Sequence, residues 1–225
     1  MATPDPTWFE RDPLELAPLL LGGVLRRADA SGAVAVRLTE VEAYRGSDDP
    51  GAHTFRGKTA RNATMFGPGG HVYCYFTYGM HHAVNIVAGP EGSGWGVLVR
   101  AGEVVEGYEL AAERRHVRRA TRIAGELARG PGNVAQALGA TLTDDGAAFH
   151  RTVDDEPVDR VGAQRRIEIP TGWSFEPATA PPHHRTGPRV GVSGPGGDAS
   201  AYPWRFWIPG EPSVSAYRPA VQRKR

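Results

Sequence analysis

At 225 residues the chain is the size of a single domain, with a formal net charge of +1, 40% apolar residues and 23% charged residues. No apolar run reaches the roughly 18 to 20 residues that span a bilayer, which argues against a membrane protein. One cysteine, Cys74, excludes an internal disulfide and multi-cysteine metal clusters, and acidic residues near the N-terminus replace the basic flank of a secretory signal, so we expect a cytoplasmic protein.

The 29 glycines and 19 prolines predict many turns and few long helices. The first predicted element is an amphipathic helix over 13–27. A strand over 33–43 follows, and its alternation puts apolar side chains such as Leu38 on one face. The same parity carries Glu40 and Glu42 onto that face unless a bulge intervenes, so the strand brings carboxylates to the edge of a core.

The rest of the chain predicts a mixture of loops, strands and helices. A long loop over 45–70 lacks sustained periodicity, and long ordered loops in compact domains are usually functional. Strands are predicted over 71–78, 83–88, 96–101, 166–169, 189–192 and 204–208, and helices over 105–119 and 132–138. We therefore expect one α+β domain over 1–225, with flexible ends at 1–8 and 217–225 and a curved, mostly antiparallel mixed β-sheet with surrounding helices.

Glu42 is the first candidate catalytic residue. A carboxylate held against apolar surface loses hydration and becomes a stronger base, which is the setting that the strand parity predicts. The alternative is a glutamate that pairs with an arginine or caps a turn. The residue alone leaves both interpretations open.

Tyrosines crowd the sequence around this carboxylate. Tyr44 follows it closely, and Tyr73, Tyr75 and Tyr78 come one after another in a later strand. Flat aromatic faces suit stacking on a nucleobase, and a cationic alkylated purine gains cation–π attraction over a neutral one. Ordinary packing within a sheet is the alternative interpretation of the same cluster.

His53, Asn85 and Arg100 are candidate polar companions of the tyrosines, although none of them is specific by itself. The adjacent histidines at 81–82 point to opposite faces of a strand, and those at 183–184 lie in a proline-rich loop. Neither pair has the spacing of a shared metal site, so we expect no metal.

Basic residues gather on the predicted helix over 105–119 and just after it. The cluster consists of Arg114, Arg115, His116, Arg118, Arg119 and Arg122. Such a cluster can neutralise phosphates of a nucleic acid. A solvated helix face balanced by acidic residues elsewhere is the alternative, and charge alone does not decide between them.

Short motifs are spread along most of the chain. They are TEVEAY at 39–44, RGKTARN at 56–62, MFGPG at 65–69, YFTYGMHH at 75–82, NIV at 85–87, VLVRA at 97–101, GPGN at 130–133, QALG at 136–139 and PWRF at 203–206. In order and spacing they closely resemble the alkyladenine (3-methyladenine) DNA glycosylase family, over roughly residues 12–215. Several linked motifs over such a span are far more specific than any one of them.

The resemblance implies a base-flipping enzyme on a mixed α/β domain that removes damaged purines from duplex DNA without a metal or organic cofactor. It implies that Glu42 deprotonates the attacking water and that Arg100 helps to hold that water and the carboxylate. Tyr44, His53 and Tyr75 are implied as the walls between which the flipped base stacks.

Other positions receive roles from the same resemblance. Tyr78 matches the side chain that wedges into the duplex, and Asn85 matches the residue that crowds the exocyclic amino group of guanine. We interpret Lys58 and Arg61 as contacts to the DNA backbone. Strand cleavage through a Schiff base needs an amine, and the chain offers only Lys58, Lys224 and its N-terminus, so we expect a monofunctional glycosylase.

The chain departs from the family pattern at Ala60, Cys74 and Gly102, none of which is a candidate site residue. Two rival functions remain open: a nucleic-acid-binding module without chemistry, and a hydrolase of free nucleosides. A binding module has no need of a carboxylate that repels phosphate, and a nucleoside hydrolase has no use for a duplex wedge. We therefore predict a monomeric enzyme whose partner is double-stranded DNA containing damaged purines.

Overall fold

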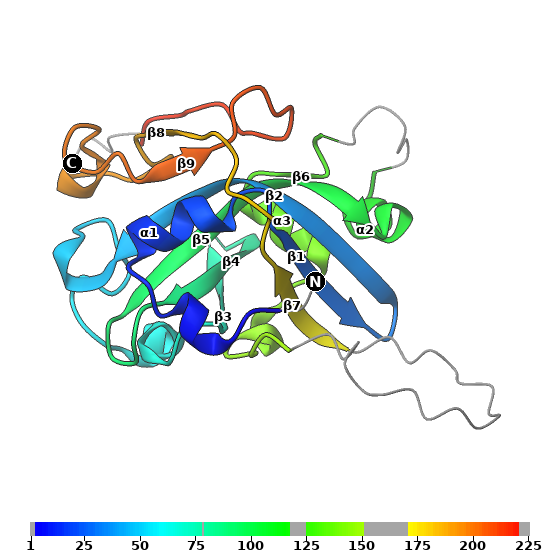
Figure 1. The fold of residues 1–225 in the computed structure, drawn as a ribbon, viewed down its shortest axis with the longest axis horizontal. Helices are drawn as coiled ribbons and strands as arrows, with labels where there is room; N and C mark the ends of the chain where they lie inside the picture. Colours follow the sequence, from blue (N-terminus) through cyan, green and yellow to red (C-terminus); the bar gives the residue numbers. More distant parts are fainter. Residues whose placement is uncertain (1–2, 78, 118–124, 151–170, 221–225) are drawn as a thin grey trace.

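A computed structural model describes residues 3–77, 79–117, 125–150 and 171–220 of the chain (Figure 1). The α-helices in these residues are α1 (Pro13–Leu20), α2 (Tyr108–Arg114) and α3 (Pro131–Leu138). The strands are β1 (Val24–Asp29), β2 (Gly32–Arg45), β3 (Val72–Thr77), β4 (His81–Ala88), β5 (Trp95–Glu106), β6 (Ala128–Arg129), β7 (Gly172–Glu176), β8 (Arg185–Gly187) and β9 (Arg205–Trp207). Short 3-10 helices are η1 (Pro6–Phe9), η2 (Gly46–Asp48), η3 (Ala60–Phe66), η5 (Leu142–Asp144) and η6 (Pro195–Gly197).

The strands of the described ranges form a 9-stranded sheet with the order β3-β4-β5-β2-β1-β7. In addition, β6 pairs with β5, and β9 pairs with both β2 and β8. All of these strand pairs are antiparallel. The predicted α+β class with a mostly antiparallel sheet is therefore confirmed. Within the same residues, no helix is long and apolar enough to cross a membrane.

A large apolar core joins distant parts of the chain, from Phe9 near the N-terminus to Phe206 near the C-terminus. Helix α1 packs on β2 and β5 and contributes Leu16 to this core. Helix α3 packs on β4 and β5 and contributes Val134. Burial of one such aliphatic side chain contributes roughly 1.5 to 3 kcal/mol, so the core gives the sheet a rigid frame on which a site can be built.

Strand β2 contains an irregularity that decides where its carboxylates point. Its pairing with β5 changes register between Leu38 and Val41. Before this bulge the core residues of β2 are even-numbered, as Val36 and Leu38 are; after it they are odd-numbered, as Val41 and Ala43 are. Because a shift of one residue reverses the face on which side chains lie, Glu42 faces away from the core. The shared face predicted for Leu38 and Glu42 is wrong, because the bulge intervenes.

The helix predicted over 13–27 is wrong in its second half. Helix α1 ends at Leu20, and Gly22 has a left-handed φ of 76°, which glycine adopts without a steric penalty. The chain turns there and continues as β1, which pairs with β2 along its whole length. Pairing and burial within the sheet outweigh the helical pattern of this segment.

The helix predicted over 105–119 is shorter in the structure. Strand β5 continues to Glu106, and Gly107, with a φ of 71°, separates it from α2; positions 118–119 lie outside the described residues. The helix over 132–138 is confirmed as α3, and the strands over 33–43, 83–88, 96–101 and 204–208 are confirmed as β2, β4, β5 and β9. The strand over 71–78 is confirmed as β3 up to Thr77, and the predicted loop over 45–70 contains η2 and η3.

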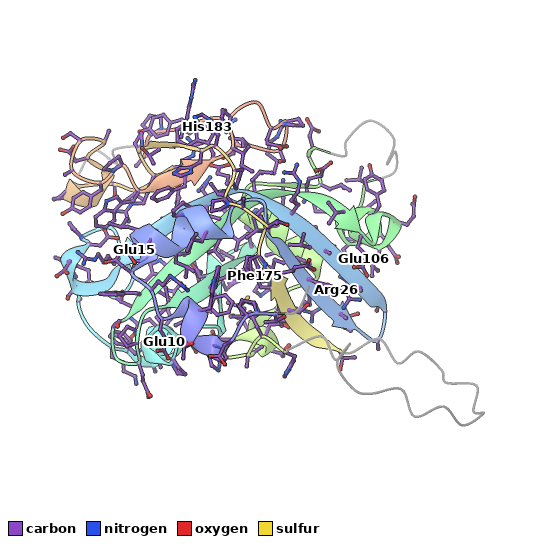
Figure 2. All side chains as sticks on the ribbon, viewed as in Figure 1. Glu10, Glu15, Arg26, Glu106, Phe175 and His183 are labelled. Atoms are coloured by element: carbon purple, nitrogen blue, oxygen red, sulfur yellow. The ribbon has the colours of Figure 1, made fainter. Side chains whose placement is uncertain are left out.

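The last part of the chain differs most from its predicted elements. The strand predicted over 189–192 is wrong, because the residues from Arg189 onward form a loop, while the predicted strand over 166–169 lies outside the described residues. Strand β7 was not predicted. Its Phe175 is fully buried and packs on Phe9 and on Trp8 of η1, and Trp8 belongs to the segment over 1–8 that was expected to be flexible. Figure 2 labels Phe175 near the middle of the view, with Arg26 and Glu106 to its right.

Candidate active site

A pocket of about 340 Å³ lies over the sheet, a volume that suits a small organic molecule. Its floor is a row of side chains from four strands. Glu42 of β2 is paired with Leu98 of β5, Leu98 with Asn85 of β4, and Asn85 with Tyr73 of β3. All four residues line the pocket, because paired residues in a sheet project to the same face.

Glu42 is completely buried, at 0% exposure, and its carboxylate accepts two hydrogen bonds. Its Oε2 accepts a 2.8 Å hydrogen bond from the hydroxyl of Tyr44, and its Oε1 accepts a 2.7 Å bond from the backbone N–H of Val190. Burial, together with the nearby charge of Glu42, raises the pKa of Tyr44 well above its usual 10, so this hydroxyl stays a donor. A carboxylate has about four lone-pair sites, which leaves capacity for a further donor.

Arg100 of β5 is the cation that faces this carboxylate. Its Nη1 lies 3.4 Å from Oε1 of Glu42, and its Nε donates a 3.0 Å hydrogen bond to Oε1 of Glu40. Burial disfavours the guanidinium charge, but the attraction of Glu42 and Glu40 outweighs it and raises the pKa of Arg100 above its usual value. The guanidinium therefore stays charged and balances the carboxylate.

The predicted aromatic walls come together in the structure. Tyr44, His53 and Tyr75 all line the pocket. The rings of His53 and Tyr75 meet edge to face with their centres 4.6 Å apart, and Tyr75 stacks on Tyr73 at 5.3 Å. Burial, with the charge of Arg61 in addition, lowers the pKa of His53 below its usual 6.5. The imidazole is therefore neutral at pH 7.

Asn85 and Tyr78 were predicted to shape the same site. Asn85 is 5% exposed, lies at the pocket floor and donates a hydrogen bond of 3.3 Å to the backbone oxygen of Tyr73. Tyr78 lies outside the described residues. Thr77, which precedes it, lines the pocket, and Met80, two residues after it, is exposed.

Lys58 and Arg61 lie beside the pocket without lining it. Both are exposed. Arg61 donates a 3.0 Å hydrogen bond to the backbone oxygen of Phe76 and borders a small hollow next to His53. The ammonium of Lys58 lies 5.9 Å from the centre of the Phe66 ring. Arg61 therefore places a positive charge beside His53 of the pocket wall, and Lys58 lies three residues earlier in the same loop.

The first members of the predicted basic cluster make internal contacts. Arg114 pairs with Asp29 of β1 at 2.9 Å and donates to the backbone oxygen of Leu138 at 2.8 Å. Arg115 donates to the side-chain oxygen of Gln136 at 2.6 Å. These two arginines tie α2 to β1 and α3, while the cluster's remaining arginines lie outside the described residues.

Sequence reasoning missed the loop after β8 as part of the site. Arg189 is fully buried, contacts Asp49 at 2.5 and 2.7 Å, and places its guanidinium 4.5 Å from the centre of the Tyr44 ring. The next residue, Val190, supplies the backbone N–H that binds Glu42. In the sequence, Arg189 stands at the start of a short apolar run, and this pattern favours a strand over a loop.

Together these groups form an arrangement suited to hydrolysis. A buried carboxylate with a charged arginine beside it can take a proton from water. Neutral aromatic faces around it can hold a flat ring by stacking. The residues predicted to bind and react, at positions 42, 44, 53, 75, 85 and 100, all border the same pocket.

Comparison with known proteins identifies the family of this chain. A family model described as methylpurine-DNA glycosylase (MPG) matches residues 7–212. A relative in Streptomyces avermitilis is 46% identical over 230 residues, covering 100% of this chain and 99% of the relative. A relative in Leifsonia xyli subsp. xyli is 47% identical over 220 residues, covering 97% and 94%. Both carry the name "Putative 3-methyladenine DNA glycosylase". The resemblance seen in the motifs is thus confirmed, and the chain belongs to the methylpurine-DNA glycosylase family.

Proposed function

We propose that this protein excises alkylated or deaminated purines, of the 3-methyladenine, 7-methylguanine and hypoxanthine type, from duplex DNA. Water attacks C1′ of the flipped nucleotide, and the N-glycosidic bond breaks with its electron pair passing to the base. The products are the purine and an abasic site. The observation that carries the proposal is a fully buried carboxylate, Glu42, at the floor of an aromatic pocket.

Glu42 acts as the general base in this scheme. Its oxygens already accept from Tyr44 and Val190, which fixes the plane of the carboxylate. A water molecule beside it can donate one proton to the carboxylate while its oxygen attacks the sugar. The negative charge also favours the oxocarbenium-like sugar in the transition state. Arg100, 3.4 Å away, holds the carboxylate and the water in place.

The leaving group explains how one carboxylate suffices. Ordinary glycoside hydrolysis uses a second carboxylic acid to protonate the departing oxygen. A purine alkylated on a ring nitrogen already carries a positive charge, so it departs as a neutral base without an added proton. Hypoxanthine is neutral and needs protonation as it leaves, so we expect it to be released more slowly.

Recognition of the base follows from the walls of the pocket. Tyr44, His53 and Tyr75 stack on the flipped purine, and their electron-rich faces attract a cationic base more strongly than a neutral one. The neutral state of His53, which follows from its lowered pKa, avoids repulsion of that cation. Asn85 at the floor crowds the exocyclic amino group of guanine and so discourages removal of the normal base.

Duplex binding completes the scheme. Tyr78 wedges into the space that the flipped nucleotide leaves, which offsets part of the few kcal/mol that flipping costs. Lys58 and Arg61 contact DNA phosphates near the mouth of the pocket. The enzyme works as a monomer, since one chain supplies the carboxylate, the arginine and the aromatic walls. It is monofunctional and acts on cytoplasmic DNA.

The test is base release from methylated duplex DNA, followed by chromatography of the liberated purines. We expect release of 3-methyladenine by the wild-type protein and a loss of about 100- to 10,000-fold in Glu42→Gln, the range for removal of a general base. Glu91→Gln is the matched control, because Glu91 is exposed and does not line the pocket.

The rival functions give different results in the same assay. A binding module retains the duplex in a mobility shift but releases no base. A nucleoside hydrolase cleaves free methylated nucleosides and leaves the duplex intact. Either result refutes the proposal.

A further inference from the structure

A second glutamate, Glu40, lies two residues before Glu42 in β2. Glu40 is completely buried, at 0% exposure, and does not line the pocket. Its Oε1 accepts hydrogen bonds from Nε of Arg205 at 2.6 Å, from the hydroxyl of Ser215 at 2.9 Å and from Nε of Arg100 at 3.0 Å. Its Oε2 accepts from the backbone N–H of Ser215 at 2.7 Å.

These contacts join three separate parts of the chain to the back of the site. Arg205 of β9 also donates to the backbone oxygen of Ser215 at 2.7 Å, and the Ser215 hydroxyl lies 3.5 Å from Nη2 of Arg100. The guanidinium of Arg100 is therefore gripped through Nε and Nη2 on one side. Its remaining nitrogen, Nη1, is the one that faces Glu42 at 3.4 Å.

The planar guanidinium makes this grip directional. Nitrogens of one guanidinium keep fixed angles to each other, so a partner on Nε sets the direction in which Nη1 points. Two arginines face two glutamates here, since Arg205 pairs with Glu40 at 2.6 Å, and Arg100 pairs with Glu40 at 3.0 Å and with Glu42 at 3.4 Å. A buried ion pair is weak evidence of added stability, because apolar replacements are often as stable. Orientation of Arg100 is a role that these buried ion pairs can have even if they add no stability.

We propose that Glu40 is a positioning residue for base excision, which with Arg205 and Ser215 orients Arg100 toward Glu42 and the attacking water. The inference rests on the proposed function of the same pocket. It makes the C-terminal segment around Ser215 a part of the catalytic apparatus, although that segment does not line the pocket.

The test measures the single-turnover rate constant of base release with enzyme in excess over methylated duplex, at several enzyme concentrations. In Glu40→Gln and in Ser215→Ala we expect the maximal rate constant to fall about 10- to 100-fold, the usual result of misplacing a reacting group by about 1 Å. The half-saturating enzyme concentration should change less than about twofold, because neither Glu40 nor Ser215 lines the pocket that holds the base.

Ser213→Ala is the matched control. The Ser213 hydroxyl is buried in the same segment and lies 2.7 Å from the hydroxyl of Thr39, so its removal costs a comparable hydrogen bond outside the network. We expect its rate constant to match the wild type. Ser215→Ala removes a hydroxyl and no charge, so it decides the question even if Glu40→Gln does not fold.

A double-variant cycle distinguishes positioning from a general structural effect. If Glu40 acts through Arg100, Glu40→Gln should slow the reaction little further in an Arg100→Gln background. Equal effects of Glu40→Gln in both backgrounds, or a wild-type rate in Ser215→Ala, would overturn the inference. Absence of base release by the wild-type protein would instead refute the proposed function, and this inference with it.

Discussion

Arg189 offers the sharpest test of how the pocket is held together. Its Nη1 contacts Asp49 at 2.5 Å and the backbone oxygen of Ala43 at 3.0 Å, and its Nη2 contacts Asp49 at 2.7 Å and the backbone oxygen of Gly196 at 2.8 Å. Its guanidinium also lies 4.5 Å from the centre of the Tyr44 ring. One buried side chain thus ties the end of β2 to the loop that carries Val190. The perturbation is Arg189→Met, which keeps the volume and removes the charge.

The expected magnitude follows from the carboxylate that is left behind. Asp49 and Arg189 both have 0% exposed side chains, so Arg189→Met leaves an uncompensated charge in the interior. Breaking a buried pair in this way costs about 3 to 5 kcal/mol, a large part of the roughly 5 to 15 kcal/mol that stabilises a typical protein. The double variant Arg189→Met with Asp49→Asn removes both charges, and we expect it to recover at least half of the loss.

Urea unfolding followed by circular dichroism measures these free energies. Arg185→Met is the control, because Arg185 is an exposed arginine on the neighbouring β8, and we expect a change within about 0.5 kcal/mol. The reasoning is refuted if Arg189→Met costs less than about 1 kcal/mol, or if the double variant is no more stable than the single one.

Four further outcomes are expected. Because the pKa of His53 lies below 6.5, its imidazole gains a proton only as the pH falls below that value. The positive imidazolium repels a cationic base, so kcat/KM for release of cationic 7-methylguanine should decline more steeply with acid in the wild type than in His53→Gln. Asn85→Ala, which removes the group expected to crowd the guanine amino group, should raise the release of unmodified guanine from normal duplex, measured by chromatography. Burial raises the pKa of the Cys74 thiol to about 12, so mass spectrometry should find no iodoacetamide adduct on the native protein at pH 8 and a full adduct in urea. Gly102→Ala should destabilise the protein by about 1 to 3 kcal/mol in urea unfolding, because its Cβ would lie 2.3 Å from Val36.

The candidate reacting residues that the sequence predicts lie at one pocket, for a local reason. Glu42 and Tyr44 are two residues apart on one strand, so strand periodicity places them together. Asn85 and Arg100 lie on strands that alternation identifies, and the motifs resemble a known family in order and spacing. The face on which Glu42 lies was still predicted wrongly, since a bulge depends on the partner strand and has no signal in β2 alone.

The supporting half could not be predicted, because its contacts are distant in the chain. Arg205 and Ser215 reach Glu40 across 165 and 175 residues, and Arg189 reaches Asp49 across 140. An arginine in a loop is usually solvated, and no local pattern shows which arginine is buried. Strand β7 was missed for a related reason, since its Phe175 is buried by η1 from the far end of the chain.

The lengths of the ion pairs distinguish Glu42, the proposed general base, from its neighbours Glu40 and Asp49. In the described residues around the pocket, Arg205 meets Glu40 at 2.6 Å and Arg189 meets Asp49 at 2.5 Å, whereas Arg100 stays 3.4 Å from Glu42. A short charge-assisted hydrogen bond uses a lone pair that a base needs, while a longer separation keeps most of the attraction and leaves the oxygen able to accept a proton. The two short pairs, at Glu40 and Asp49, stabilise the structure around the pocket, and the longer pair leaves Glu42 able to accept a proton from water.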